Sequence, residues 1–130
     1  MAGLLDGKVV VISGVGPALG TTLARRCAEQ GADLVLAVGA DLEVGWLPAV
    51  LQGASNPRVL PGQMGYFEGA AQLTLAERGQ AADRSAGDVH PAGNPHYYMD
   101  PERMATLART LADRLASLDP AGTAAYRQRA

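Results

Sequence analysis

Residues 32–46 read ADLVLAVGADLEVGW, and this stretch decides which fold the chain adopts. Its first half is an apolar run, which is typical of a strand buried on both faces of a parallel sheet. Gly39 interrupts the run, and Trp46 then opens an apolar stripe at helical spacing that ends at Gly53. The stretch therefore predicts a strand over residues 32–38 and a helix that begins near Trp46, with Pro48 in its first turn.

A second buried strand is predicted upstream, over residues 8–13 (KVVVIS). The turn GVGPALG follows it and leads into a helix that ends near Gln30. Leu19, Leu23 and Cys27 recur every four residues in this helix, so we expect them on its buried face, with Cys27 as a small core residue. Strand, glycine turn, helix and strand together make a βαβ unit.

The remaining elements are predicted from shorter signals. Residues 58–61 suggest a third strand, and Gln72–Ala76 is a weak apolar run that suggests another. Asp100 and Pro101 have the pattern of a helix cap followed by the first helical residue, and an apolar stripe continues to Leu118. Asp119 and Pro120 repeat that signal for a short helix through Tyr126. Tyr97 and Tyr98 are expected to cover the core.

These elements predict an α/β fold with three α/β/α layers, Rossmann-like or flavodoxin-like, on a mostly parallel sheet of about four strands. Residues 8–13, 32–38 and 58–61 would form the centre of that sheet. The chain has 130 residues, enough for one compact domain. An unpaired sheet edge would invite a second copy to form a homodimer, a question that the sequence leaves open.

Composition excludes several classes of function. The net charge of −2 argues against nucleic-acid binding, and no apolar run is long enough to span a membrane. The first residues lack a secretory pattern, so we expect soluble cytoplasmic expression and leave localisation open. Cys27 is the only cysteine, which excludes an internal disulfide and a thiolate zinc cluster. Lys8 is the only lysine, which argues against any mechanism that needs an active-site lysine.

The glycine turn at residues 13–20, SGVGPALG, is a candidate phosphate site because it exposes backbone N–H groups at the start of a helix. Together with LLDGKVVVISG and TTLARRCAEQGADLVLA, it resembles the nucleotide turn of short-chain dehydrogenases/reductases over about residues 4–38. The resemblance implies weak binding of NADP or another adenine nucleotide at Gly14, Gly16 and Gly20, although Ala18 replaces the middle glycine. The family's Tyr-xxx-Lys motif is absent, so no enzyme activity is expected. Alternatively, the turn only packs strand against helix.

A second resemblance begins near residue 32 and runs to residue 130. GADLEVGWLPAVLQGASNPRVLPGQMGYFEG, GDVHPAGNPHYYMDPERM and ASLDPAGTAAYRQRA resemble one lobe of the metal-binding solute-binding proteins of zinc and manganese ABC importers. The resemblance implies that His96, in Asn-Pro-His, is a zinc ligand. His90 would help if its loop folds back, and Asp88 and Asp100 are further carboxylates, Asp100 being better explained as a helix cap. Alternatively, both histidines are exposed loop residues whose partner ligands are absent.

Two resemblances that meet in one strand suggest an engineered chimera. Residues 1–38 would be a dehydrogenase-like fragment and residues 39–130 an importer-like fragment, sharing one core as a single domain. Three functions follow: a scaffold without catalysis that needs no cofactor, a weak zinc binder through His96, or a weak nucleotide binder at the glycine turn.

Overall fold

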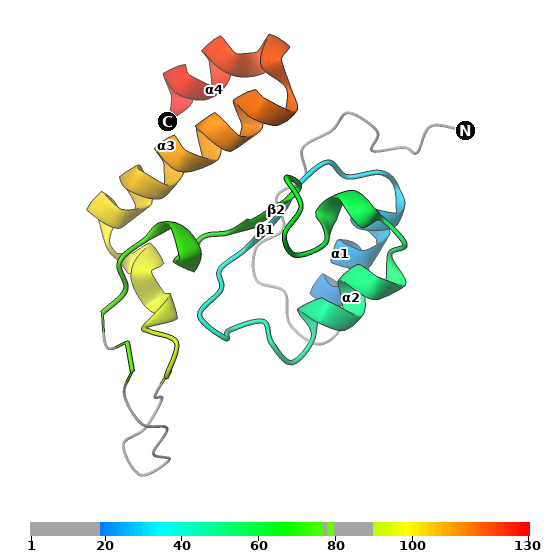
Figure 1. Cartoon of the computed structure of the whole chain (residues 1–130), viewed down its shortest axis with the longest axis horizontal. Coiled ribbons are helices and arrows are strands. Elements are labelled where there is room, and N and C mark those ends of the chain that lie inside the picture. Colours follow the sequence, from blue (N-terminus) through cyan, green and yellow to red (C-terminus); the bar gives the residue numbers. More distant parts are fainter. Residues whose placement is uncertain (1–18, 77, 80–89) are drawn as a thin grey trace. The chain divides into compact units, whose positions relative to one another are not determined.

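A computed structural model describes residues 19–76, 78–79 and 90–130, which divide into two compact units (Figure 1). The described part of the first unit comprises residues 19–37 and 43–67. The second unit comprises residues 38–42 together with the described residues from Glu68 onward. The predicted strand at residues 8–13 lies outside the described residues. The proposed boundary at residue 38 stays a prediction.

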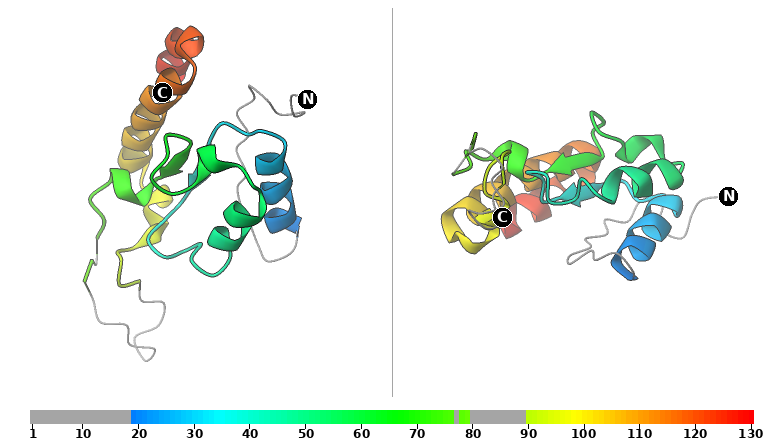
Figure 2. Two further views of the ribbon diagram at one scale, coloured as in Figure 1. Left: turned by 45° about the vertical axis from the view of Figure 1, so that its right-hand side comes forward. Right: turned by 90° about the horizontal axis from the view of Figure 1, so that it is seen from below.

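The first unit contains two short helices, α1 (Leu19–Glu29) and α2 (Leu47–Gly53), which pack against each other (Figure 2). Helix α2 confirms the expected bounds, with a proline in its first turn. The buried cluster between the elements consists of Ala28, Ala37, Leu47, Leu51, Ala54 and Val59.

The residues that α1 buries differ from those that the sequence predicts. Leu23 is 46 % exposed and Cys27 is only half-buried, whereas Ala28 is fully buried in the cluster. A small alanine at this position lets α1 approach its neighbours closely. The helix therefore uses a different face from the one that the leucine spacing predicts.

The sheet has two parallel strands, β1 (Val35–Ala37) and β2 (Tyr66–Glu68). The amide of Val35 donates to the carbonyl of Gly65 at 2.7 Å. A β-carbon at Gly65 would lie 2.5 Å from the carbonyl oxygens of Asp33 and Arg58, so only glycine allows this approach. Strand β1 confirms the centre of the strand expected at residues 32–38, whereas β2 was not predicted.

Residues 58–61 do not form the predicted strand. They begin inside the 3-10 turn η1 (Pro57–Val59), in which Pro57 fixes the backbone and Oδ1 of Asn56 accepts from the amide of Arg58 at 3.2 Å. Asn56 is buried, and its Nδ2 donates to the carbonyls of Ala28 and Ala32 at 3.1 and 3.0 Å. The hydrogen bonds of the buried Asn56 side chain thus stabilise a turn at this position instead of a strand.

Among its described residues, the second unit has the 3-10 turns η2 (Ala70–Gln72) and η4 (Pro95–Met99) before its helices. The weak run at residues 72–76 lies at the end of η2 and beyond, and it is not a strand. Helix α3 (Pro101–Leu118) follows η4, then the turn η5 (Pro120–Gly122) and helix α4 (Thr123–Arg129). Helix α4 packs beside the end of α3 (Figures 1 and 2).

The two predicted caps have different outcomes. Oδ1 of Asp100 accepts from the amides of Glu102 and Arg103 at 3.0 and 3.3 Å, which confirms the first cap. The Asp119 side chain makes no such bond to the helix that follows. Its carboxylate instead accepts from the hydroxyl of Tyr126 at 2.7 Å, so the expectation of a second capping side chain was wrong.

The fold class is therefore mixed α/β with a small parallel sheet. In the described part of the chain the sheet has two strands, and the expected four strands and three layers stay predictions. Across those same residues, no helix has the length and apolar character to cross a membrane. The homodimer likewise stays a prediction.

Candidate metal centre

His96 lies on a turn whose backbone is held by a hydrogen bond to a nearby residue in the sequence. Oδ1 of Asn94 accepts from the amide of His96 at 2.9 Å, which closes an Asx turn around the buried Pro95. The imidazole of His96 is exposed. The turn η4 therefore presents this side chain to solvent from a restrained backbone.

Tyr97 anchors the same turn to the interior of the second unit. Its side chain is 4 % exposed, and its hydroxyl donates to the carbonyl of Val38 at 2.9 Å. The expectation that both tyrosines cover the core is confirmed for Tyr97 and wrong for Tyr98, which is 46 % exposed. The hydroxyl of Tyr98 lies 2.8 Å from Nδ1 of His96 instead.

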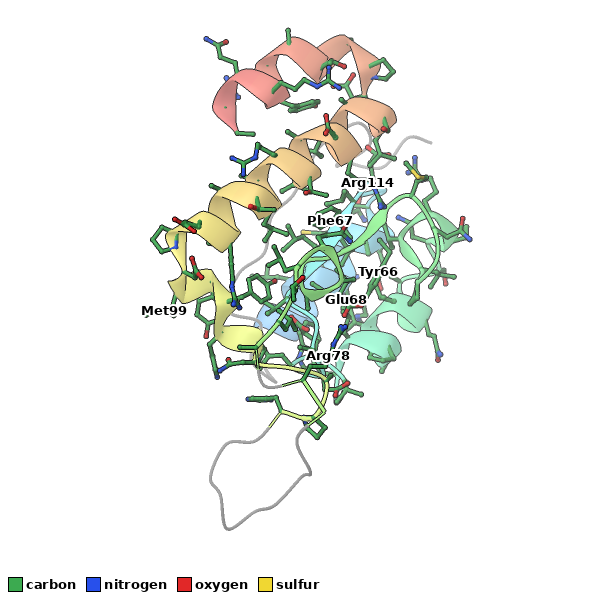
Figure 3. The ribbon with its side chains drawn as sticks, turned by 60° about the vertical axis from the view of Figure 1, so that its left-hand side comes forward. Tyr66, Phe67, Glu68, Arg78, Met99 and Arg114 are labelled. Atoms are coloured by element: carbon green, nitrogen blue, oxygen red, sulfur yellow. The ribbon has the colours of Figure 1, made fainter. Side chains whose placement is uncertain are left out.

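His90 lies at the end of a stem, which is formed by residues 76, 78 and 79 on one side and 91–94 on the other (Figure 3 labels Arg78 on this stem). The amide of Gly79 donates to the carbonyl of Pro91 at 3.0 Å, and the amide of Asn94 donates to that of Ala76 at 3.0 Å. Nε of Arg78 donates to the carbonyl of Ala92 at 3.4 Å. These bonds hold the two sides of the stem together and so place His90.

The stem turns back toward η4 at Gly93. The amide of Gly93 donates to the carbonyl of His90 at 2.9 Å, and its φ of +114° is a backbone conformation that other residues rarely adopt. A β-carbon there would lie 2.8 Å from Cβ of Leu75. Glycine is therefore needed for the turn that joins the two histidines.

The structure brings the two predicted histidines together. Their ring centroids are 5.6 Å apart and the ring planes meet at 76°. Within residues 19–76, 78–79 and 90–130, no group of three or more His, Cys, Asp or Glu side chains could hold a metal ion. Asp88 lies outside the described residues. Asp100 is used as the helix cap, and its Oδ2 also pairs with Arg103 at 3.1 Å.

The contact between Tyr98 and His96 was not predicted from the sequence. The available signal was a hydroxyl-bearing side chain two residues after a histidine in a proline turn. In an extended strand, residues two apart lie on one face, whereas in a helix they do not. The turn η4 is neither, so spacing alone did not reveal the contact.

The other candidate site is described only at its end. Gly14 and Gly16 lie outside the described residues, and Gly20 lies in the first turn of α1. The nucleotide site at the glycine turn stays a prediction.

A comparison with models of known protein families shows the family to which the chain belongs. The family model described as ZnuA, zinc-uptake complex component A periplasmic, matches residues 22–130. The chain belongs to this family. No curated protein and no solved structure matches it.

The family match begins earlier in the chain than the importer resemblance was expected to begin. It begins at residue 22, inside α1, and not near residue 32. Most of the helix that was assigned to a dehydrogenase-like fragment therefore lies within the importer family. The comparisons give no support to the dehydrogenase resemblance or to an engineered chimera.

Proposed function

We propose that the chain binds zinc as its cargo through His90 and His96, and that it is a binding protein rather than an enzyme. The observation that carries the proposal is the approach of the two imidazole rings to a centroid separation of 5.6 Å. The family supports it, since its matched description is that of a zinc-uptake component.

The separation of the rings suits a shared ion. A zinc–nitrogen bond of about 2.0–2.1 Å places the ion roughly 3.2 Å from each ring centroid, so two imidazoles at a tetrahedral angle have centroids about 5.3 Å apart. The observed separation is close to that value. The rings meet edge-on at 76°, so a shared ion requires them to turn until one nitrogen of each faces a common point.

The two histidines that would bind the ion lie on different elements of the structure. His90 is half-buried at the end of the stem, and His96 is exposed on η4. A site with two imidazoles leaves two positions of a tetrahedral zinc ion open to water or to further ligands. We therefore propose weak, reversible binding, as a carrier that must release its cargo requires.

A zinc titration of the wild-type chain and single variants tests the proposal. We expect one zinc ion per chain in wild type, loss of binding in His96→Ala and at least tenfold weaker binding in His90→Ala. Met99→Ala is the matched control, because Met99 is on the same turn and 78 % exposed (Figure 3). Equal binding by wild type and His96→Ala would overturn the proposal.

A second candidate function is nucleotide binding at residues 13–20, which precede the family match. It is supported by the resemblance of residues 13–20 to a nucleotide turn and by the helical conformation of α1 from Leu19 onward, as the dehydrogenase resemblance expects. This candidate depends on the dehydrogenase-like fragment of the chimeric scaffold, which was expected over residues 1–38. Calorimetric titration with NADPH tests the proposal, and it fails if wild type gives no heat of binding.

A further inference from the structure

We infer that Tyr98 is a positioning residue of the zinc centre: its hydroxyl accepts a hydrogen bond from Nδ1 of His96 and so makes Nε2 the metal-binding atom. The inference rests on the proposed function, and it adds a residue outside the Asn-Pro-His motif. Its geometric basis is the 2.8 Å distance between the hydroxyl oxygen and Nδ1.

The chemistry of a neutral imidazole requires this direction of the hydrogen bond when a metal ion is bound. One ring nitrogen carries the proton and the other offers its lone pair. If Nε2 of His96 binds the ion, the proton must be on Nδ1, which then donates to the hydroxyl of Tyr98. Metal-bound histidines usually donate their second N–H to such a partner, which fixes the ring and its tautomer.

Tyr98 is itself held in place by aromatic contacts. Its ring meets the ring of His96 edge-on, with centroids 5.7 Å apart, and it meets the ring of Tyr97 at 6.3 Å. Tyr97 is buried and bonded to the carbonyl of Val38. The hydroxyl that bonds His96 is therefore supported by a side chain anchored in the interior of the same unit.

A rigid ring orientation matters more at a site with few ligands. The rings of His90 and His96 must each aim one nitrogen at the same point. A freely rotating His96 would have to lose that freedom on binding, and binding would be weaker. The bond to Tyr98 orders the ring before the ion arrives.

The variant Tyr98→Phe removes the hydroxyl and keeps the ring contacts. Tyr126→Phe is the matched control, because Tyr126 also bonds a side chain, Asp119, and is not part of the centre. Two quantities are measured on each protein. They are the zinc affinity, by competition with a chromophoric chelator, and the ¹⁵N chemical shifts of the His96 ring in the metal-free and zinc-bound states.

We expect Tyr98→Phe to bind zinc about tenfold more weakly than wild type and Tyr126→Phe to match wild type. The ring nitrogens of His96 should show a larger share of the Nδ1–H tautomer in metal-free wild type than in Tyr98→Phe. An unchanged affinity in Tyr98→Phe, or a weakened affinity with unchanged His96 shifts, overturns the inference. If wild type itself binds no zinc, the proposed function fails, and the role of Tyr98 in metal binding fails with it.

Discussion

The hydroxyl of Tyr97 occupies the space that a β-carbon on Gly69 would need. The same hydroxyl donates to the carbonyl of Val38 at 2.9 Å, and a β-carbon on Gly69 would also lie 3.2 Å from Cζ of Tyr97. The absence of a side chain at Gly69 therefore allows Tyr97 to anchor the turn that carries His96. This close packing makes a direct prediction about stability.

We expect Gly69→Ala to lower the free energy of unfolding by about 1–3 kcal/mol, because the new methyl group displaces a buried tyrosine. Tyr97→Phe removes the obstructing oxygen at a loss of about 1 kcal/mol from the hydrogen bond. In the double variant the alanine should therefore be less damaging than in wild type. Urea unfolding of the four proteins measures this coupling, and additive effects would contradict the packing described above.

Replacing Gly93 by alanine should lower stability more than the same replacement at Gly79. Gly79 and Gly93 both have positive φ, but a β-carbon on Gly79 meets no atom within 4 Å, whereas one on Gly93 lies 2.8 Å from Leu75. Gly79→Ala should destabilise by about 1–2 kcal/mol from backbone strain alone. Gly93→Ala adds the clash and should lose about 2–4 kcal/mol.

The same pair should differ in zinc affinity. Gly93→Ala opens the turn between His90 and His96 and should weaken binding more than Gly79→Ala, which strains the stem without a steric clash. Chelator competition on both variants, with thermal unfolding to verify that each is folded, measures the difference. Equal affinities in the two variants would show that this turn does not place His90.

The cap at Asp100 is predicted to stabilise α3. Asp100→Ala removes the acceptor for two backbone amides and should cost about 1 kcal/mol, within a range of roughly 0.5–2 kcal/mol. Asp100→Asn keeps an acceptor oxygen and loses only the partly exposed ion pair with Arg103, so its effect should be smaller. Circular dichroism during urea unfolding compares the two, and a larger loss in the asparagine variant would contradict the capping role.

The stabilisation that Tyr126 provides near the C-terminal end of α3 should depend on pH. The hydrogen bond to the Asp119 carboxylate raises the pKa of Tyr126 above its ordinary value, since the neutral phenol is the donor. A raised pKa in the folded state means that the stabilisation is present at neutral pH and is lost as the pH rises through the folded pKa. Asp119→Asn should bring the Tyr126 pKa back down, as ultraviolet titration of tyrosinate against a Tyr126→Phe reference would show. An unchanged titration would contradict this pairing.

Local signals in the sequence predicted the helices well. The Asp100–Pro101 pair and the stripe after Trp46 each report on a few adjacent residues, and α3 and α2 begin where those signals lie. The apolar run at residues 32–38 likewise became β1. The strand expected at residues 58–61 failed because the side chain of Asn56 reaches carbonyls 24 and 28 residues away, which no local pattern contains.

The candidate site was predictable in its residues and not in its geometry. The Asn-Pro-His motif pointed to His96, and the resemblance added His90 only on condition that the loop folds back. That condition depends on Gly93 and on the stem bonds of residues 76, 78 and 79 with residues 91, 92 and 94, which lie far from them in the sequence. The contact of Tyr98 with His96 depends on the turn η4, whose backbone follows no regular period.

X-ray absorption spectroscopy of the chain loaded with one equivalent of zinc tests the shared ion most directly. Outer-shell scattering counts the imidazole ligands of the ion. We expect two imidazoles at a zinc–nitrogen distance of about 2.0–2.1 Å in wild type and one in His90→Ala. A spectrum with one imidazole or none in wild type would show that His90 and His96 do not bind the same ion.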